Sequence, residues 1–95
     1  MIKIIAKIPV QAEKLNDFKT LGAELVERSR AEAGNVSYSL NVSNNDPLLL
    51  VFIEFWKDQD AIDSHNNSEH FTRIFPQLAA MASGEIIGEF YTEVC

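Results

Sequence analysis

The sequence has almost no cysteine: Cys95, the last residue, stands alone, so no disulfide can form within the chain. It also has no apolar run that approaches the roughly 20 residues needed to span a bilayer. The first residues alternate charged and apolar side chains, unlike the apolar core of a secretory signal peptide. These absences predict a cytoplasmic protein without a membrane-spanning segment.

Basic residues are also scarce: the sequence has 8 Lys and Arg but 14 Asp and Glu, which gives a net charge of −6. A nucleic-acid-binding protein needs a Lys/Arg surface to neutralise phosphates, so we expect no nucleic-acid partner. The chain lacks Gly-rich phosphate-binding loops, Cys pairs and a His-x-x-x-His helix motif, which predicts no cofactor. His65 and His70 are five residues apart across an expected helix break. This spacing is poor for one metal ion, although histidines and carboxylates could still converge in space, and we expect no metal.

What is present describes one ordinary globular domain over residues 1–95, with 46% hydrophobic and 23% charged residues. Its most informative stretch is a strand at residues 48–56 that is apolar on both faces. One face carries Leu48, Leu50, Phe52, Glu54 and Trp56, and the other carries Leu49, Val51, Ile53 and Phe55. Helices on one side of a sheet require only one apolar face. We therefore assign Glu54 and Trp56 to the second face, which must meet more of this chain or another copy, and expect a pocket there.

The rest of the chain supplies three more strands and two helical regions. Strands are expected at residues 2–8, 35–43 and 85–94, and a helix at 12–33, where Gly34 ends it in a left-handed conformation. Asp58 and Ser68 should cap two short helices, the second kinked or restarted at Pro76. The order β-α-β-β-α-β predicts an α+β, ferredoxin-like fold, a four-stranded antiparallel sheet with helices on one face. The uncovered apolar face predicts a homodimer.

Glu54 and His65 are the candidate catalytic residues. A carboxylate among apolar side chains must be paired, hydrogen-bonded or protonated, and an ion pair across a dimer with Arg28, Arg30 or Arg73 is the structural alternative. His65 lies on the inner face of its helix and could act as a general base, or could be a buried histidine bonded to a backbone carbonyl. Trp56 and Tyr38 could stack on an aromatic ligand or simply pack in the core.

A family resemblance rests on Glu54-Phe-Trp56 followed by Ala61, His65, Ser68 and His70-Phe71, and on Glu32-x-Gly-x-x-x-Tyr38. This pattern resembles the antibiotic biosynthesis monooxygenase domain family. The resemblance implies a dimeric ferredoxin-like α/β barrel with a pocket between sheet and helices in each subunit, lined by Glu54, Trp56, His65 and His70. The haem-degrading branch of that family has a later histidine where this chain has Phe75, so haem is not expected.

The resemblance implies a monooxygenase that needs no cofactor and oxidises a quinol or phenol-type aromatic with O2. His65 would be the base; Trp56, Phe52 and Tyr38 would orient a flat substrate, and Asn35 or Ser37 could hold its carbonyl. One alternative is an isomerase or degradation enzyme for a small phosphorylated signal metabolite, with Glu54 and His65 moving protons and Lys3, Lys7 or Arg73 binding the phosphate. Another is a non-catalytic dimer that binds a small hydrophobic metabolite.

Overall fold

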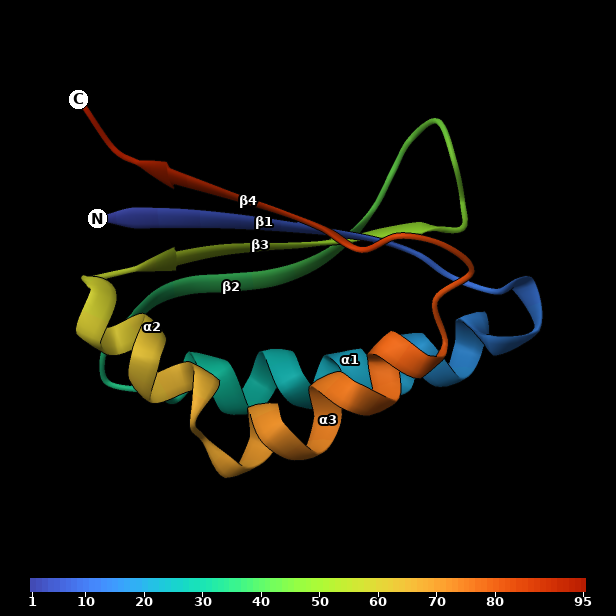
Figure 1. The fold of residues 1–95 in the computed structure, drawn as a ribbon, viewed down its shortest axis with the longest axis horizontal. Coiled ribbons are helices and arrows are strands. Elements are labelled where there is room, and N and C mark those ends of the chain that lie inside the picture. The colour runs from blue at the N-terminus through green and yellow to red at the C-terminus, as the bar shows by residue number, and fades with distance from the viewer.

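The computed structural model describes residues 1–95, in one sheet layer and one helix layer (Figure 1). The elements are β1 (Ile2–Pro9), the 3-10 helix η1 (Ala12–Lys14), α1 (Leu15–Arg30), β2 (Asn35–Val42), β3 (Leu49–Trp56), α2 (Gln59–Asn66), α3 (Glu69–Ala80) and β4 (Ile87–Thr92). The strands pair antiparallel in the order β2-β3-β1-β4. The predicted ferredoxin-like fold is confirmed, with the second helical region divided into α2 and α3. None of the helices combines the length and apolar composition that crossing a membrane requires.

The two central strands build the core on the side that the helices cover. Leu50, Phe52, Glu54 and Trp56 of β3 are 0–6% exposed, and their partners on β1 are Ile8, Ala6, Ile4 and Ile2. The prediction that Glu54 and Trp56 lie on the face away from the helices is therefore wrong. Alternation divides a strand into two faces, but both faces of β3 are apolar and the pattern does not say which one helices cover.

The opposite side of the sheet is the outer face, and its β3 residues Leu49, Val51, Ile53 and Phe55 are half-buried. Ser37, Ser39 and Asn41 of β2 pair with three of them, so the small polar side chains of β2 also lie on this face. The outer face is thus apolar along β3 and polar toward the β2 edge.

Gly34 has a different role from the one predicted. No residue of the chain has a positive φ, so Gly34 does not end α1 in a left-handed conformation. A Cβ at Gly34 would instead lie 2.3 Å from the Cβ of Ala61, closer than any side chain tolerates. The connection from α1 to β2 therefore packs directly against α2, and this brings Glu32 beside that helix.

The caps of α2 and α3 are confirmed. Asp58 accepts a hydrogen bond from the backbone N–H of Ala61 (2.9 Å), and Ser68 accepts one from that of Phe71 (3.2 Å). The predicted restart at Pro76 is absent, because α3 continues from Glu69 to Ala80. Pro76 and Thr72, whose carbonyl loses its helical partner, are both exposed. Water can satisfy that carbonyl, so the helix need not restart.

Candidate functional site

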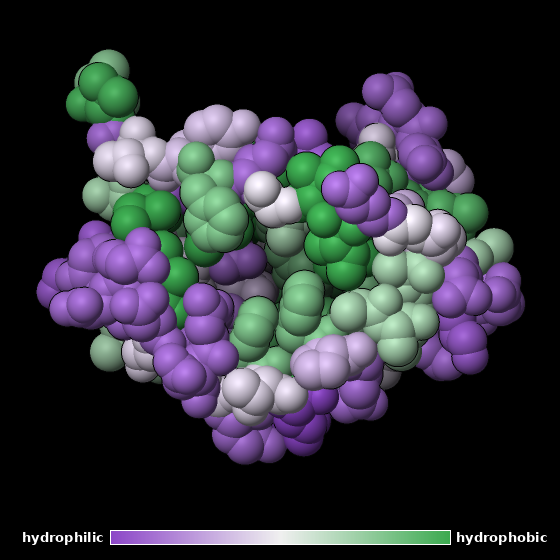
Figure 2. Space-filling model, viewed as in Figure 1, coloured by the Kyte–Doolittle hydropathy of each residue, from purple (hydrophilic) through white to green (hydrophobic).

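A small cavity lies between the sheet and the helices, beneath β1 and β4 and above α2 and α3. Its volume is about 180 Å³, below the ~300 Å³ at which pockets for drug-sized ligands begin. Figure 2 shows this side of the molecule hollowed near its centre, with apolar side chains around the opening. The lining residues are Ile4, Ala6, Glu54, Ile62, His65, Asn66, Phe71, Phe75, Ile86, Gly88 and Phe90. The two predicted catalytic residues, Glu54 and His65, therefore meet in one mostly apolar cavity.

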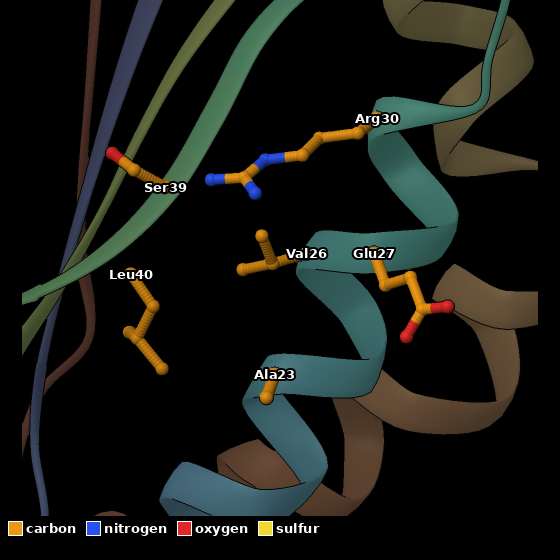
Figure 3. A pocket seen from close by; sticks show the side chains of 6 residues that line it. All are labelled: Ala23, Val26, Glu27, Arg30, Ser39 and Leu40. Atoms are coloured by element: carbon orange, nitrogen blue, oxygen red, sulfur yellow. The ribbon is translucent and has the colours of Figure 1, made fainter.

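A second hollow, of about 660 Å³, lies between α1 and β2. Figure 3 shows Arg30 reaching from α1 toward β2 across this space, while Glu27 points away from it. The Nε of Arg30 donates to the Tyr38 carbonyl at 2.8 Å. No buried ionisable side chain lines this hollow, so the smaller cavity is the candidate site.

Glu54 extends from β3 into the core and is 6% exposed. Its Oε1 accepts a hydrogen bond from the indole Nε1 of Trp56 at 2.9 Å. Burial raises the pKa of Glu54 to about 7, although the hydrogen bonds from Trp56 and Tyr38 act in the opposite direction. Near neutral pH the side chain can therefore both donate and accept a proton.

Within this chain none of the three candidate arginines pairs with Glu54, and the ion pair expected across a dimer stays a prediction. Arg28 and Arg73 both bind Glu24, and Arg30 is bonded to the Tyr38 carbonyl. Glu54 is thus a hydrogen-bonded carboxyl with a raised pKa, one of the three states expected for it from the sequence.

His65 is 2% exposed, and its Nδ1 lies 2.6 Å from Oε2 of Glu32. A carboxylate only accepts hydrogen bonds, so Nδ1 carries the proton and a neutral His65 has its lone pair on Nε2. Nε2 is buried without a hydrogen-bond partner. Burial lowers the pKa of His65, and the contact with Glu32 acts in the opposite direction. The cavity wall therefore contains an imidazole that can accept a proton.

The break between α2 and α3 brings His70 to the same carboxylate. His70 Nε2 lies 2.8 Å from Oε2 of Glu32, and the donor atoms of Glu32, His65 and His70 all lie within 4.8 Å of one another. The sequence spacing was expected to be poor for one metal ion, with convergence of histidines and carboxylates left open, and the structure shows that convergence. The separation of the two histidines in sequence is taken up by the turn that Ser68 caps.

Glu32 is a site residue that was not predicted from the sequence, where it was noted only as the first residue of the Glu-x-Gly-x-x-x-Tyr pattern. The signal available for it was Gly34, because a glycine two residues away permits the close approach to α2. Phe71 and Phe75 were also missed as cavity residues. Their rings stack at 5.0 Å with planes 12° apart, and both are half-buried because one side faces the cavity.

The other predicted binding residues lie around the cavity. Trp56 packs against the His65 ring with centroids 4.6 Å apart. Tyr38 packs on Phe52, Trp56 and His65 at 5.8, 6.1 and 5.5 Å. These aromatic residues support Glu54 and His65 from behind and are absent from the cavity lining.

Asn35 lies at the end of β2, and its amide donates to the carbonyls of Ser37 (3.1 Å) and Phe55 (3.2 Å). It stabilises the irregular pairing of β2 with β3 there. Asn35 and Ser37 are both remote from the cavity lining.

Three comparisons with known proteins agree on the family. The sequence model described as antibiotic biosynthesis monooxygenase matches residues 1–77. The chain is 39% identical over 71 residues, 75% of each protein, to "Putative monooxygenase YcnE" of Bacillus subtilis (strain 168). A crystal structure of an antibiotic biosynthesis monooxygenase superposes over the whole of both chains with a TM-score of 0.94 and 36% identity. A conserved protein from Methanosarcina mazei Go1 gives a TM-score of 0.92 and 33% identity, covering 95% of this chain and 89% of that one.

Proposed function

Because the chain belongs to the antibiotic biosynthesis monooxygenase family, we propose that it oxidises a small phenol or quinol with O2 and without a cofactor. One observation carries this proposal. A single, mostly apolar cavity presents a carboxyl group with a pKa of about 7 on one side and an unpaired imidazole nitrogen on the other. Pairs of titratable groups held in different protonation states are typical of acid–base sites.

In the proposed reaction, His65 Nε2 removes the proton from the phenolic hydroxyl. The imidazolium that forms is stabilised by Glu32, which lies 2.6 Å from Nδ1. The electron-rich phenolate then transfers one electron to O2, and the radical pair combines to form a carbon–oxygen bond. Apolar walls such as Phe71 and Phe75 exclude water, which would otherwise intercept the reduced oxygen.

Glu54 completes the reaction as proton donor and acceptor. It gives its proton to the distal peroxide oxygen, and its carboxylate then takes the proton from the ring carbon that carries the peroxide. The O–O bond breaks, a second carbonyl forms, and the departing hydroxide takes the proton from His65. The sum is phenol plus O2 giving quinone plus water. The substrate supplies all the electrons, and both side chains return to their starting states.

The phosphorylated-metabolite alternative receives less support, because the cations that it requires lie elsewhere. Lys3 lies over the Phe55 ring at 5.0 Å, Lys7 pairs with Glu89 at 3.1 Å, and Arg73 binds Glu24 and Glu69. A cavity lined by apolar residues and without Lys or Arg suits an aromatic ring better than a phosphate.

We also propose that the protein functions as a homodimer whose subunits pack through their outer faces. Val51, Ile53 and Phe55 lie half-buried along β3 there, with Ile5 beside Ile53 and lysines at either end, and apolar residues grouped on one face are typical of an interaction surface. A two-fold axis would place each such surface against its own copy.

The experiment measures O2 uptake with 1-naphthol or a dihydroxynaphthalene and follows ¹⁸O from ¹⁸O2 into the product by mass spectrometry. We expect one labelled oxygen atom per product and a 10²- to 10⁴-fold lower kcat/KM for His65→Ala. Asp63→Asn is the matched control, because Asp63 lies on the same helix but is exposed, and its carboxylate accepts a side-chain hydrogen bond from Gln59 alone. Uptake no faster than in buffer across these phenols, or full activity of His65→Ala, contradicts the proposal.

A further inference from the structure

Glu32, His65 and His70 form a cluster of metal-ligating atoms. Only His65 also lines the cavity that the proposed reaction uses, and it joins the cluster through its other ring nitrogen, Nδ1. The three residues come from three different elements: the α1–β2 connection, the last turn of α2 and the first turn of α3. Glu32 Oε2 is 2.6 Å from His65 Nδ1 and 2.8 Å from His70 Nε2. Two imidazoles and one carboxylate are the protein ligands of many zinc sites in which a fourth position is left to water.

The charge around Glu32 also favours a cation. Glu32 is 15% exposed, and neither a lysine nor an arginine pairs with it, so the two histidines are its side-chain partners. The chain as a whole carries a net charge of −6. A partly buried carboxylate without a fixed positive partner is a group that a divalent ion would stabilise. His70 is 14% exposed, so part of the cluster is in contact with solvent.

We propose that Glu32, His65 and His70 bind one divalent cation of the zinc class, and that this ion converts His65 from a proton acceptor into a proton donor. The chemistry follows from the two ring nitrogens. A metal ion on Nδ1 uses the lone pair there, so the proton of the neutral imidazole must move to Nε2. The same ring that presents a lone pair without the ion presents an N–H with it.

The geometry requires only a small adjustment. Ligand atoms about 2.1 Å from a tetrahedral zinc ion stand roughly 3.4 Å apart. The two nitrogen–oxygen distances must therefore lengthen by less than 1 Å from 2.6 and 2.8 Å, which rotation of the long Glu32 side chain can provide. The two imidazole nitrogens, which lie within 4.8 Å of each other, must reach the same separation by movement of the rings.

The consequence for catalysis rests on the proposed function. If His65 Nε2 is the base, an ion on Nδ1 removes its lone pair and stops turnover while Glu54 and the cavity remain intact. The site is then an inhibitory one, and a chelator restores activity. Ion binding itself does not depend on which reaction the cavity performs, so it is measured separately.

The binding experiment titrates ZnCl2 into chelator-treated protein by calorimetry, in a Cys95→Ser background because an exposed terminal thiol also binds zinc. We expect one ion per chain, and at least tenfold weaker binding for Glu32→Gln and for His70→Gln. Glu69→Gln is the matched control: it alters the carboxylate next to His70 in sequence, which faces Arg73 instead, and should bind as the parent does. No saturable heat, or equal binding by Glu32→Gln, overturns the site.

The tautomer is read by long-range ¹H–¹⁵N NMR of the imidazoles, which needs neither substrate nor a variant. We expect the His65 Nε2 resonance to change from that of an unprotonated nitrogen to that of an N–H as zinc is added. An unchanged Nε2 resonance at saturating zinc overturns the switch. If the oxygenase assay fails while the NMR change is seen, the ion site stands and the proposed function falls.

Discussion

The two faces of β3 have similar hydrophobicity and very different surroundings. On the inner face Leu50, Phe52, Glu54 and Trp56 are almost fully buried under the helices, whereas on the outer face Val51, Ile53 and Phe55 remain half-buried. The inner face contains an ionisable group, Glu54, whose pKa is raised to about 7 by burial. The comparison shows that covering by helices, rather than composition, turns one side of a strand into a site.

The largest contrast is expected between Phe52→Ala and Ile53→Ala. Phe52 is 1% exposed, so its truncation should lower the free energy of unfolding by about 3–5 kcal/mol. Ile53→Ala should lower it by about 1 kcal/mol at low protein concentration, and by more as concentration rises and a dimer covers the residue. Urea unfolding at two protein concentrations measures both. A concentration-independent cost for Ile53→Ala would count against the outer face as an interface.

Glu54→Gln tests the carboxyl on the inner face. A pKa raised from 4.5 to about 7 means that the native state holds the proton more tightly than the unfolded chain does. The stabilisation that results from this raised pKa is therefore complete below pH 4.5 and disappears as the pH rises through 7. The free energy of unfolding changes by an amount on the order of 3 kcal/mol over this range. Subtracting the pH–stability curve of Glu54→Gln from that of the parent isolates the effect. A flat difference curve between pH 4.5 and 7.5 would contradict the assignment.

Ile53→Lys tests the dimer through the outer face. A charge placed in the middle of an apolar interface must be desolvated without a partner, so the dimer dissociation constant should rise at least tenfold. Thr72→Lys adds the same charge on the exposed side of α3 and should leave association unchanged. Sedimentation velocity at micromolar concentration distinguishes the two. A parent protein that already sediments as a monomer would remove the basis for the proposed homodimer.

The smallest effect is expected for Glu89→Gln. Glu89 lies 3.1 Å from Lys7, and both side chains are about one-third exposed or more. Such pairs contribute about 0–1 kcal/mol because water screens them. Thermal unfolding at pH 7 should therefore change little. A decrease in the free energy of unfolding as large as the change expected from the Glu54 pKa shift would contradict this prediction. It would show that exposure does not determine how much a carboxylate of this sheet contributes to stability.

The elements were predictable because they depend on local chemistry. Strict alternation marked β2, a run of residues apolar on both faces marked β3, and the side chains of Asp58 and Ser68 begin α2 and α3 as predicted. The helix does not restart at Pro76, one of the two outcomes predicted there, since an exposed helix position tolerates the missing N–H. Gly34 was expected to end a helix by its backbone freedom, and the structure requires it for lack of a side chain.

Half of the candidate site was predictable. Glu54 is conspicuous as a charge in an apolar run, and His65 lies on the inner face of its helix, so both were found. Glu32 was not found, because it lies in a connection and becomes a site residue only where that connection meets α2. Phe71 and Phe75 were assigned to the core, since an apolar residue beside a cavity has the same sequence pattern as one in a filled interior.

The sequence by itself determined which stretches form strands and helices, their order, the family, and the presence of a buried carboxylate. These follow from side-chain periodicity, from capping groups and from motif spacing along the chain. Only the tertiary structure decided which face of β3 the helices cover, and that one carboxylate lies against two histidines 33 and 38 residues away. Such contacts depend on how separate elements pack against one another. A local sequence pattern does not indicate which distant residues will come into contact.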